Sequence, residues 1–220
     1  MARIARIVLP GIPHLVTQRG NRREPVFFED GDYILYKRLL TEAAERAGTA
    51  VWAYCLMPNH VHLILVPKTE DGLRATLADA HRRYTRHINA RHDWTGHLWQ
   101  GRFASVAMDE EHLMHAVRYV SLNPVRARLI RRARDWKWAS TRAHLAGKSD
   151  GLVDVAPVLE RYPDFRALLK GGEDAEMSAL IHNAETIGRP LGSEDWLKKV
   201  ERKLGRRVRP LKRGPKPKAE

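Results

Sequence analysis

The feature that most constrains the fold is the uncharged stretch Ala47–Pro67, because 30% of the residues in this 220-residue chain are charged. The stretch approaches the length of a membrane span, but the turn-forming pair Pro58-Asn59 divides it. Proline fixes φ and asparagine tolerates unusual dihedrals, so the pair marks a turn. The sequence therefore predicts two buried strands, Ala50–Met57 and His60–Val66, joined as an antiparallel hairpin.

Further elements flank this hairpin. We expect strands at Pro13–Arg19 and Gly101–Ala107, helices at Asp32–Ala47 and Asp71–Arg91, and a third helix that opens at Asp109. The order β-α-β-β-α-β-α predicts an α+β fold, a ferredoxin-like or RRM-like antiparallel sheet with helices on one face.

The chain divides into three parts by composition. We expect a catalytic or binding domain over residues 1–130, a helical extension over 131–204, and a disordered basic tail over 205–220. The single cysteine, Cys55, excludes an intramolecular disulfide and suits a reducing compartment. No segment reads as a signal peptide or membrane span, so we expect a cytoplasmic protein with no membrane partner.

The formal net charge of +13 indicates a polyanionic partner, nucleic acid first and an anionic membrane surface second. Lys198–Glu220 carries +9 of this charge, which leaves only +4 for the rest of the chain. Within that rest, basic and aromatic residues suit phosphate contacts and the stacking of unpaired bases, although they are also compatible with a solvated surface and a core aromatic pair. The candidate DNA-binding residues are Arg19, Arg22, Arg23, Arg82, Arg83, Arg86, Trp99, Gln100 and Arg102.

Two pairs of residues could support chemistry. His60 and His62 are two apart on a strand and share one face, where a bound cation would satisfy both imidazoles. Tyr119 and Asn123 are four apart on the third helix, and supply a possible nucleophile and a possible hard-metal ligand. Taken alone, the first pair is also compatible with two hydrogen-bonded histidines. The second pair is also compatible with a tyrosine that packs in the core and an asparagine that prepares a helix stop before Pro124.

Several segments occur together in a recognisable order. They are HLVTQRGNRR (His14–Arg23), WAYCLMPNHVHLILVP (Trp52–Pro67), LWQGRF (Leu98–Phe103), RYVSLNPVRARLI (Arg118–Ile130) and DWKWAS (Asp135–Ser140). Over about residues 1–145 the chain resembles the IS200-like single-tyrosine (Y1) HUH transposases, and within them the branch associated with repetitive extragenic palindromes (REP).

The resemblance implies a role for each candidate. His60 and His62 would be metal ligands, Asn123 would occupy the third-ligand position that is often Gln, and Tyr119 would be the nucleophile that forms a 5′-phosphotyrosine. The metal would be Mg²⁺ or Mn²⁺, although imidazole-rich sites on chemical grounds alone prefer zinc. The substrate would be single-stranded or hairpin DNA at a bacterial nucleoid, and the protein would be a monomer or a homodimer.

Two other functions remain open. A non-catalytic single-stranded nucleic-acid-binding module of the same fold would bind without metal and tolerate loss of both histidines. A hydrolytic zinc enzyme could use the histidine pair, but no His-Glu-x-x-His run or cysteine pair supports it.

Overall fold

The computed structural model describes residues 6–171 and 175–209 and has a four-stranded sheet at its centre. The strands are β1 (His14–Arg19), β2 (Thr49–Met57), β3 (His60–Pro67) and β4 (Ala104–Ala107), in the order β2-β3-β1-β4 with every neighbouring pair antiparallel. Helices α1 (Asp30–Ala47) and α2 (Gly72–His92) connect β1 to β2 and β3 to β4. This arrangement confirms the predicted ferredoxin-like α+β fold.

The ends of these elements follow from local chemistry. Helix α1 begins after Glu29, which forms a capping box with Asp32, and it ends at Gly48 in the left-handed conformation. Strand β4 starts at Ala104, later than the predicted Gly101, because Gly101 adopts a φ of 56° and turns the chain before the strand.

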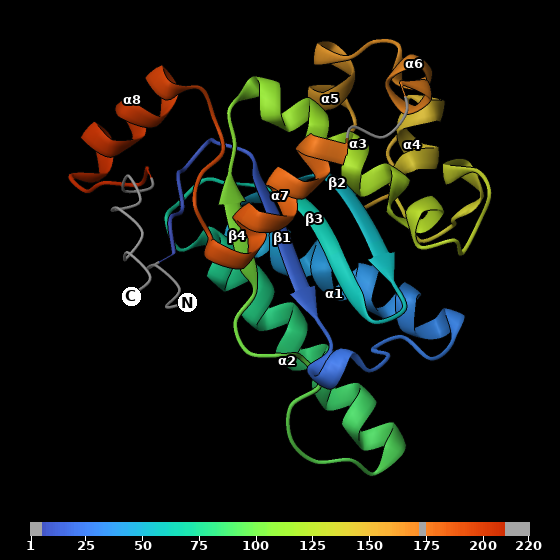
Figure 1. Ribbon diagram of the computed structural model, residues 1–220. Coiled ribbons are helices and arrows are strands. Elements are labelled where there is room, and N and C mark those ends of the chain that lie inside the picture. Colours follow the sequence, from blue (N-terminus) through green and yellow to red (C-terminus); the bar gives the residue numbers. More distant parts are fainter. Residues whose placement is uncertain (1–5, 172–174, 210–220) are drawn as a thin grey trace, which may run out of the picture.

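Helices cover both faces of the sheet. Val61, Leu63 and Leu65 of β3 pack on the layer of α1 and α2, so the two helices of the ferredoxin-like unit share one face as predicted. Helices α3 (Glu110–Arg126) and α7 (Ala175–Ile187) lie on the opposite face, in front of the sheet in Figure 1. The expectation of helices on one face therefore does not extend to α3, because its apolar stripe needs a partner and the second sheet face provides one.

The segment after residue 130 is helical, as predicted, and it packs directly against the sheet. It contains the 3₁₀ turn η2 (Ala133–Asp135) and the helices α4 (Thr141–Ala146), α5 (Ala156–Arg161), α6 (Phe165–Lys170), α7 and α8 (Glu194–Leu204). Another 3₁₀ turn, η1 (Asn21–Arg23), follows β1. The Leu56 N–H donates to the Trp138 carbonyl at the β2 edge, and the Leu191 N–H donates to the Ala107 carbonyl at the β4 edge. The extension thus protects both edges of the sheet.

The start of the predicted basic tail packs against α8. Val208 is buried, and the Arg209 guanidinium forms ion pairs with Glu194 (3.0 Å) and Glu201 (2.8 Å). The expected disorder therefore does not begin at residue 205, because an apolar contact and two carboxylates hold these residues in place. Residues 210–220 of the predicted tail lie outside the described residues. In the described part of the chain, no helix is both long enough and apolar enough to cross a bilayer.

Candidate active site

The two histidines lie on β3, the strand that pairs with β1 on one side and β2 on the other. Strand alternation directs both side chains to the face covered by α3 and α7. Their rings are 4.8 Å apart between centroids and nearly perpendicular, and His60 and His62 are only 9% and 1% exposed. Two imidazoles are therefore held together in a largely dry part of the fold, as the sequence predicted.

His60 is oriented by the turn that precedes it. Its Nδ1 lies 2.6 Å from Asn59 Oδ1, and the Asn59 amide nitrogen donates to the Arg23 carbonyl, which fixes the oxygen toward the ring. Nδ1 is therefore the donor, and the lone pair of neutral His60 resides on Nε2. Burial, with the charges of His62 and of Arg19, its partner on β1, lowers the pKa of His60 to about 2. The ring is thus neutral at physiological pH, as metal ligation requires.

His62 is held by residues from two other elements. Thr17 lies opposite it on β1, with Oγ1 3.0 Å from Nδ1, and the same hydroxyl donates to Glu185 Oε1 of α7. Because the single hydroxyl proton goes to Glu185, the Nδ1–H of His62 must donate to Thr17. Burial alone would raise the pKa of Glu185, but hydrogen bonds from His62 and Thr17, with the charge of His62, hold it below its ordinary value.

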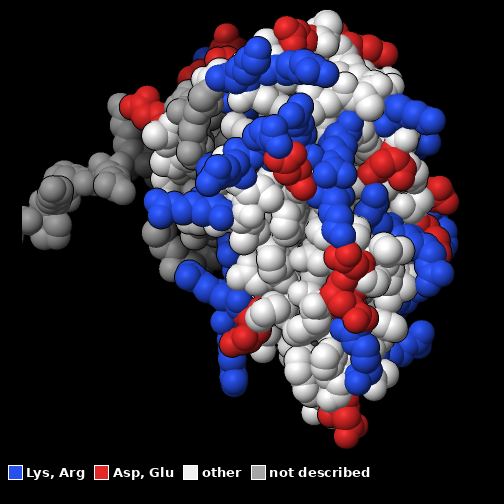
Figure 2. Space-filling view, turned by 90° about the vertical axis from the view of Figure 1, so that its right-hand side faces the viewer, with Lys and Arg blue, Asp and Glu red and all other residues white. Residues whose placement is uncertain are grey.

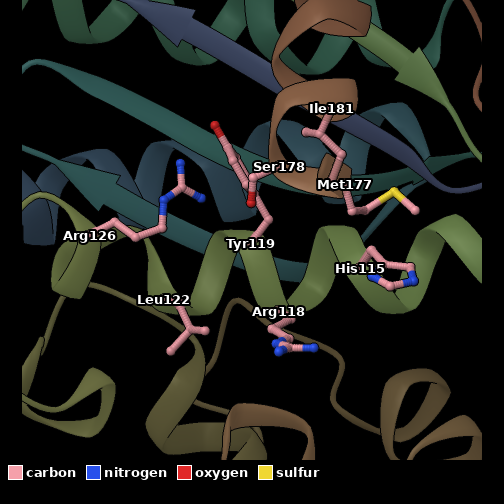
Figure 3. A pocket seen from close by; sticks show the side chains of 8 residues that line it. All are labelled: His115, Arg118, Tyr119, Leu122, Arg126, Met177, Ser178 and Ile181. Atoms are coloured by element: carbon pink, nitrogen blue, oxygen red, sulfur yellow. The ribbon is translucent and has the colours of Figure 1, made fainter. Parts of the chain in front are cut away.

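Tyr119 rises from α3 toward the sheet, between Arg126 and the α7 side chains Met177 and Ile181 (Figure 3). Its ring centroid lies 5.4 Å from that of His62, edge-on at 88°. Burial raises the pKa of the phenol and the charge of Glu185 raises it further, whereas a hydrogen bond and the charge of Arg126 lower it. The predicted nucleophile and the predicted metal ligands are therefore brought together.

Asn123 follows Tyr119 by one helical turn and is 7% exposed. Helix α3 does not stop at Pro124 but continues to Arg126, so Tyr119 and Asn123 remain on the same regular helix. Two imidazole Nε2 lone pairs and an amide oxygen are a donor set that a divalent cation can use. Among the described residues, no group of three or more His, Cys, Asp or Glu side chains is arranged to hold a metal ion. The role of Asn123 as third ligand stays a prediction.

A groove of about 710 Å³ opens between α2 and the segment before β4. It is basic and aromatic, and its lining includes Arg74, Arg82, Arg86, Arg102, Trp99 and Phe103. Figure 2 shows that Lys and Arg side chains are spread widely over another face of the molecule, with Asp and Glu among them. Charge alone therefore does not single out one surface, and the groove differs by its hollow shape and its aromatic lining.

Two further hollows adjoin this groove. One of about 490 Å³ shares Gln18 and Arg102 with it and reaches Thr17 and Glu185 of the histidine site. The other, of about 420 Å³, shares His97 and lies at the far end of α2. Shared lining residues therefore link the three hollows in a row from Thr17 and Glu185 to the far end of α2, and we call this row the track.

Most of the predicted DNA-binding residues line this track. Arg82, Arg86 and Trp99 lie in the central groove, Arg19 and Gln100 in the hollow near the site, Arg22 in the far hollow, and Arg102 in two of them. Arg23 is exposed in the adjoining η1 turn. Arg83 is different: its Nη1 lies 2.7 Å from Glu42 Oε2 of α1, because consecutive helical residues point in different directions.

Sequence reasoning missed four residues of the site. Thr17 lies on the predicted strand Pro13–Arg19 and Asn59 directly precedes His60, so the sequence contained a local signal for both. Arg126 lies in the NPVR segment, one helical turn beyond Asn123. Glu185 had no local signal, because only the tertiary fold brings α7 to the histidines.

Known proteins resemble this chain in sequence and in fold. The family described as "Transposase IS200 like" matches residues 11–123, just over half of the chain. A putative REP-associated tyrosine transposase from Haemophilus influenzae is 25% identical over 121 residues, covering 50% of this chain and 69% of that protein. A solved REP-associated tyrosine transposase bound to a REP hairpin superposes with a TM-score of 0.58 at 20% identity, covering 70% of this chain and 90% of that one. The chain therefore belongs to the family of IS200-like transposases.

Proposed function

We propose that this protein is a metal-dependent DNA strand transferase that cleaves and rejoins single-stranded DNA next to a hairpin, with Tyr119 as nucleophile. The observation that carries the proposal is the position of Tyr119, whose ring lies 5.4 Å from that of His62 although the two residues come from separate elements. A buried phenol beside two imidazoles and an arginine is suited to phosphoryl transfer.

The cleavage step is a transesterification. The Tyr119 oxygen forms a bond to the scissile phosphorus, the P–O3′ bond breaks, the phenol loses its proton and the departing 3′ oxygen gains one. The product is a 5′-phosphotyrosine and a free 3′-hydroxyl, and attack by another 3′-hydroxyl reverses the step and joins strands without ATP. Arg126 stabilises the tyrosinate, and the protein's packing around Tyr119 orients it for in-line attack.

His60, His62 and Asn123 would hold Mg²⁺ or Mn²⁺. Such an ion, when bound, supplies Lewis-acid stabilisation of the charge that develops on the scissile phosphate. The protein's own contribution is to orient both imidazoles, through Asn59 on one ring and Thr17 on the other, and to keep His60 neutral by burial.

The DNA would follow the basic track beside α2. The hollow that holds Arg19 and Gln100 adjoins Thr17 and Glu185, so a strand in the groove is led toward the histidines. The relative that is bound to a REP hairpin supports hairpin DNA as the ligand class. With DNA as the substrate, we expect the protein to act at the nucleoid.

The test is covalent capture. The full chain is mixed with a hairpin oligonucleotide that carries a single-stranded flank, labelled on either side of the cleavage site, in Mg²⁺ or Mn²⁺. We expect a protein–DNA adduct that survives denaturation with the wild type and is absent with Tyr119→Phe, which keeps the ring but removes the reactive oxygen. Tyr162→Phe is the matched control, since Tyr162 lies far along the chain and its hydroxyl donates to the Glu110 carbonyl.

Three results would contradict the proposal. They are an adduct that persists in Tyr119→Phe, metal-independent adduct formation, and wild-type binding of the hairpin with no adduct in either metal. The last result would favour the non-catalytic binding module. His60→Ala and His62→Ala should abolish adduct formation but retain hairpin binding, because the groove itself is unchanged.

A further inference from the structure

Glu185 is the most unusual charged residue next to the histidine site. It comes from α7, more than a hundred residues after His62, and only 7% of it is exposed. A carboxylate removed from water is costly unless hydrogen bonds and opposite charge support it. Its contacts therefore indicate what this carboxylate does.

Those contacts lead to the metal-ligating ring through a chain of three groups. The His62 Nδ1–H donates to Thr17 Oγ1 at 3.0 Å, and the Thr17 hydroxyl donates to Glu185 Oε1. Glu185 Oε1 is also 3.5 Å from His62 Nδ1, within ion-pair range. The carboxylate accepts only, so it sets the direction of both hydrogen bonds.

This direction decides which nitrogen of His62 carries the proton. In the neutral ring, an Nδ1–H directed at Thr17 and Glu185 leaves the lone pair on Nε2, on the other side of the ring from Glu185. Metal-ligating histidines commonly donate their second N–H to a carboxylate or carbonyl, which fixes the tautomer and raises ligand basicity. Asn59 Oδ1 holds His60 in the same Nδ1–H form, so both rings present Nε2.

We propose that Glu185 of the C-terminal extension is a positioning residue of the metal site, which acts through Thr17 to hold His62 with Nε2 available to the cation. This inference rests on the proposed function for the identity of the ligands, but it concerns a residue outside the segment that matches the transposase family. It means that the histidine site is assembled from the ferredoxin-like unit and the extension together.

The first test is the tautomer of His62 in the metal-free full chain. Nitrogen chemical shifts of the imidazole, assigned by loss of the signal in His62→Ala, should show a protonated Nδ1 and an unprotonated Nε2. The opposite tautomer in the wild type overturns the proposal, and this result does not depend on the folding of any Glu185 variant or on detection of DNA cleavage.

The second test is Mn²⁺ affinity, measured by the electron paramagnetic resonance signal of the free ion. We expect Glu185→Ala to weaken binding about 10- to 100-fold, the usual effect of removing such an outer partner. Glu185→Gln should lose less, since its amide oxygen still accepts from Thr17. Glu176→Ala is the matched control, because Glu176 is exposed on the same helix.

Variants of Thr17 distinguish a positioning role of Glu185 from direct ligation of the metal by Glu185. Thr17→Val should weaken Mn²⁺ binding as Glu185→Ala does, Thr17→Ser should restore it, and the double variant Thr17→Val/Glu185→Ala should be no weaker than either single variant, since both interrupt one chain. If Glu185→Ala abolishes Mn²⁺ binding while Thr17→Val has no effect, Glu185 is a ligand and the positioning role is wrong. Absence of a covalent DNA adduct in the wild type would instead contradict the proposed function.

Discussion

The guanidinium carbon of Arg126 lies 4.1 Å from the centre of the Tyr119 ring, one cation stacked on the phenol of the proposed nucleophile. Burial and the charge of Glu185 raise the pKa of this phenol, and Arg126 opposes them. The balance between these groups determines how much tyrosinate exists at a given pH.

Arg126→Ala should therefore slow adduct formation and move its pH dependence to higher pH. The folded pKa of Tyr119 rises when the cation is lost, and each unit of rise leaves about tenfold less tyrosinate at a fixed pH below it. Rates of adduct formation between pH 6.5 and 9.5 measure the effect. Arg131→Ala, at an exposed position beyond the helix, should leave the profile unchanged, and an identical profile for Arg126→Ala would contradict the role of this cation.

Two neighbouring arginines on α2 should differ in DNA binding. Arg82 lines the groove, whereas Arg83 pairs with Glu42 of α1. Arg82→Ala should weaken hairpin binding and lower the slope of log affinity against log salt by about one for the lost phosphate contact. Arg83→Ala should preserve both quantities. Equal losses in the two variants, measured by fluorescence anisotropy over a salt series, would show that the groove is not the DNA path.

The far end of the track carries exposed aromatic rings. Trp94 is 48% exposed and stacks on His92 at 4.5 Å between centroids, and Phe28 lies 5.7 Å from Trp94 and is 40% exposed. Unpaired bases stack on such rings for about 1–3 kcal/mol each. Trp94→Ala should weaken binding of a hairpin with unpaired bases but not of a blunt duplex. Ile34→Ala, at a 62% exposed apolar site on α1, is the control.

Two buried histidines outside the site should make stability depend on pH. Burial lowers the pKa of His14 to about 4 and that of His81 to about 3, from an ordinary 6.5. Between pH 6.5 and 4 the two histidines are protonated in the unfolded chain but remain neutral in the folded chain. The free energy of unfolding therefore falls as the pH falls through this window. Near pH 5 these two groups contribute roughly 2–3 kcal/mol per pH unit.

Urea unfolding of the full chain from pH 7 to 4.5 measures this slope. His81→Gln should reduce the measured slope near pH 5 by about 1.4 kcal/mol per pH unit, the contribution of one such group. Glutamine does not titrate and can still bond to the Tyr36 hydroxyl that His81 contacts at 2.9 Å. An unchanged slope in His81→Gln would mean that His81 is protonated in the folded state.

The local pattern of the sequence was sufficient for much of the fold and part of the site. The hairpin turn at Pro58-Asn59, the alternation of β3 and the helical spacing of Tyr119 and Asn123 each depend on neighbours in the chain, and the structure reproduces all of them. The placement of α3 on the second face was not predicted, because an apolar stripe shows that a helix is covered but not by which surface.

Glu185 marks the limit of such reasoning. A glutamate in the middle of a helix has the same local pattern whether it faces water or a histidine, and only the packing of α7 on β1 and β4 decides between them. Arg82 and Arg83 illustrate the same point, since two adjacent basic residues separate into a groove contact and an ion pair.

The extension that pairs with β2 and β4 has a consequence during synthesis. A ribosome that has released only the first 130 residues exposes a sheet with two open edges, and open edges recruit strands from other molecules. The nascent protein can therefore aggregate through these edges until Trp138 and Leu191 have emerged and cover them. We expect slower translation over the last third of the gene to lower the yield of soluble protein.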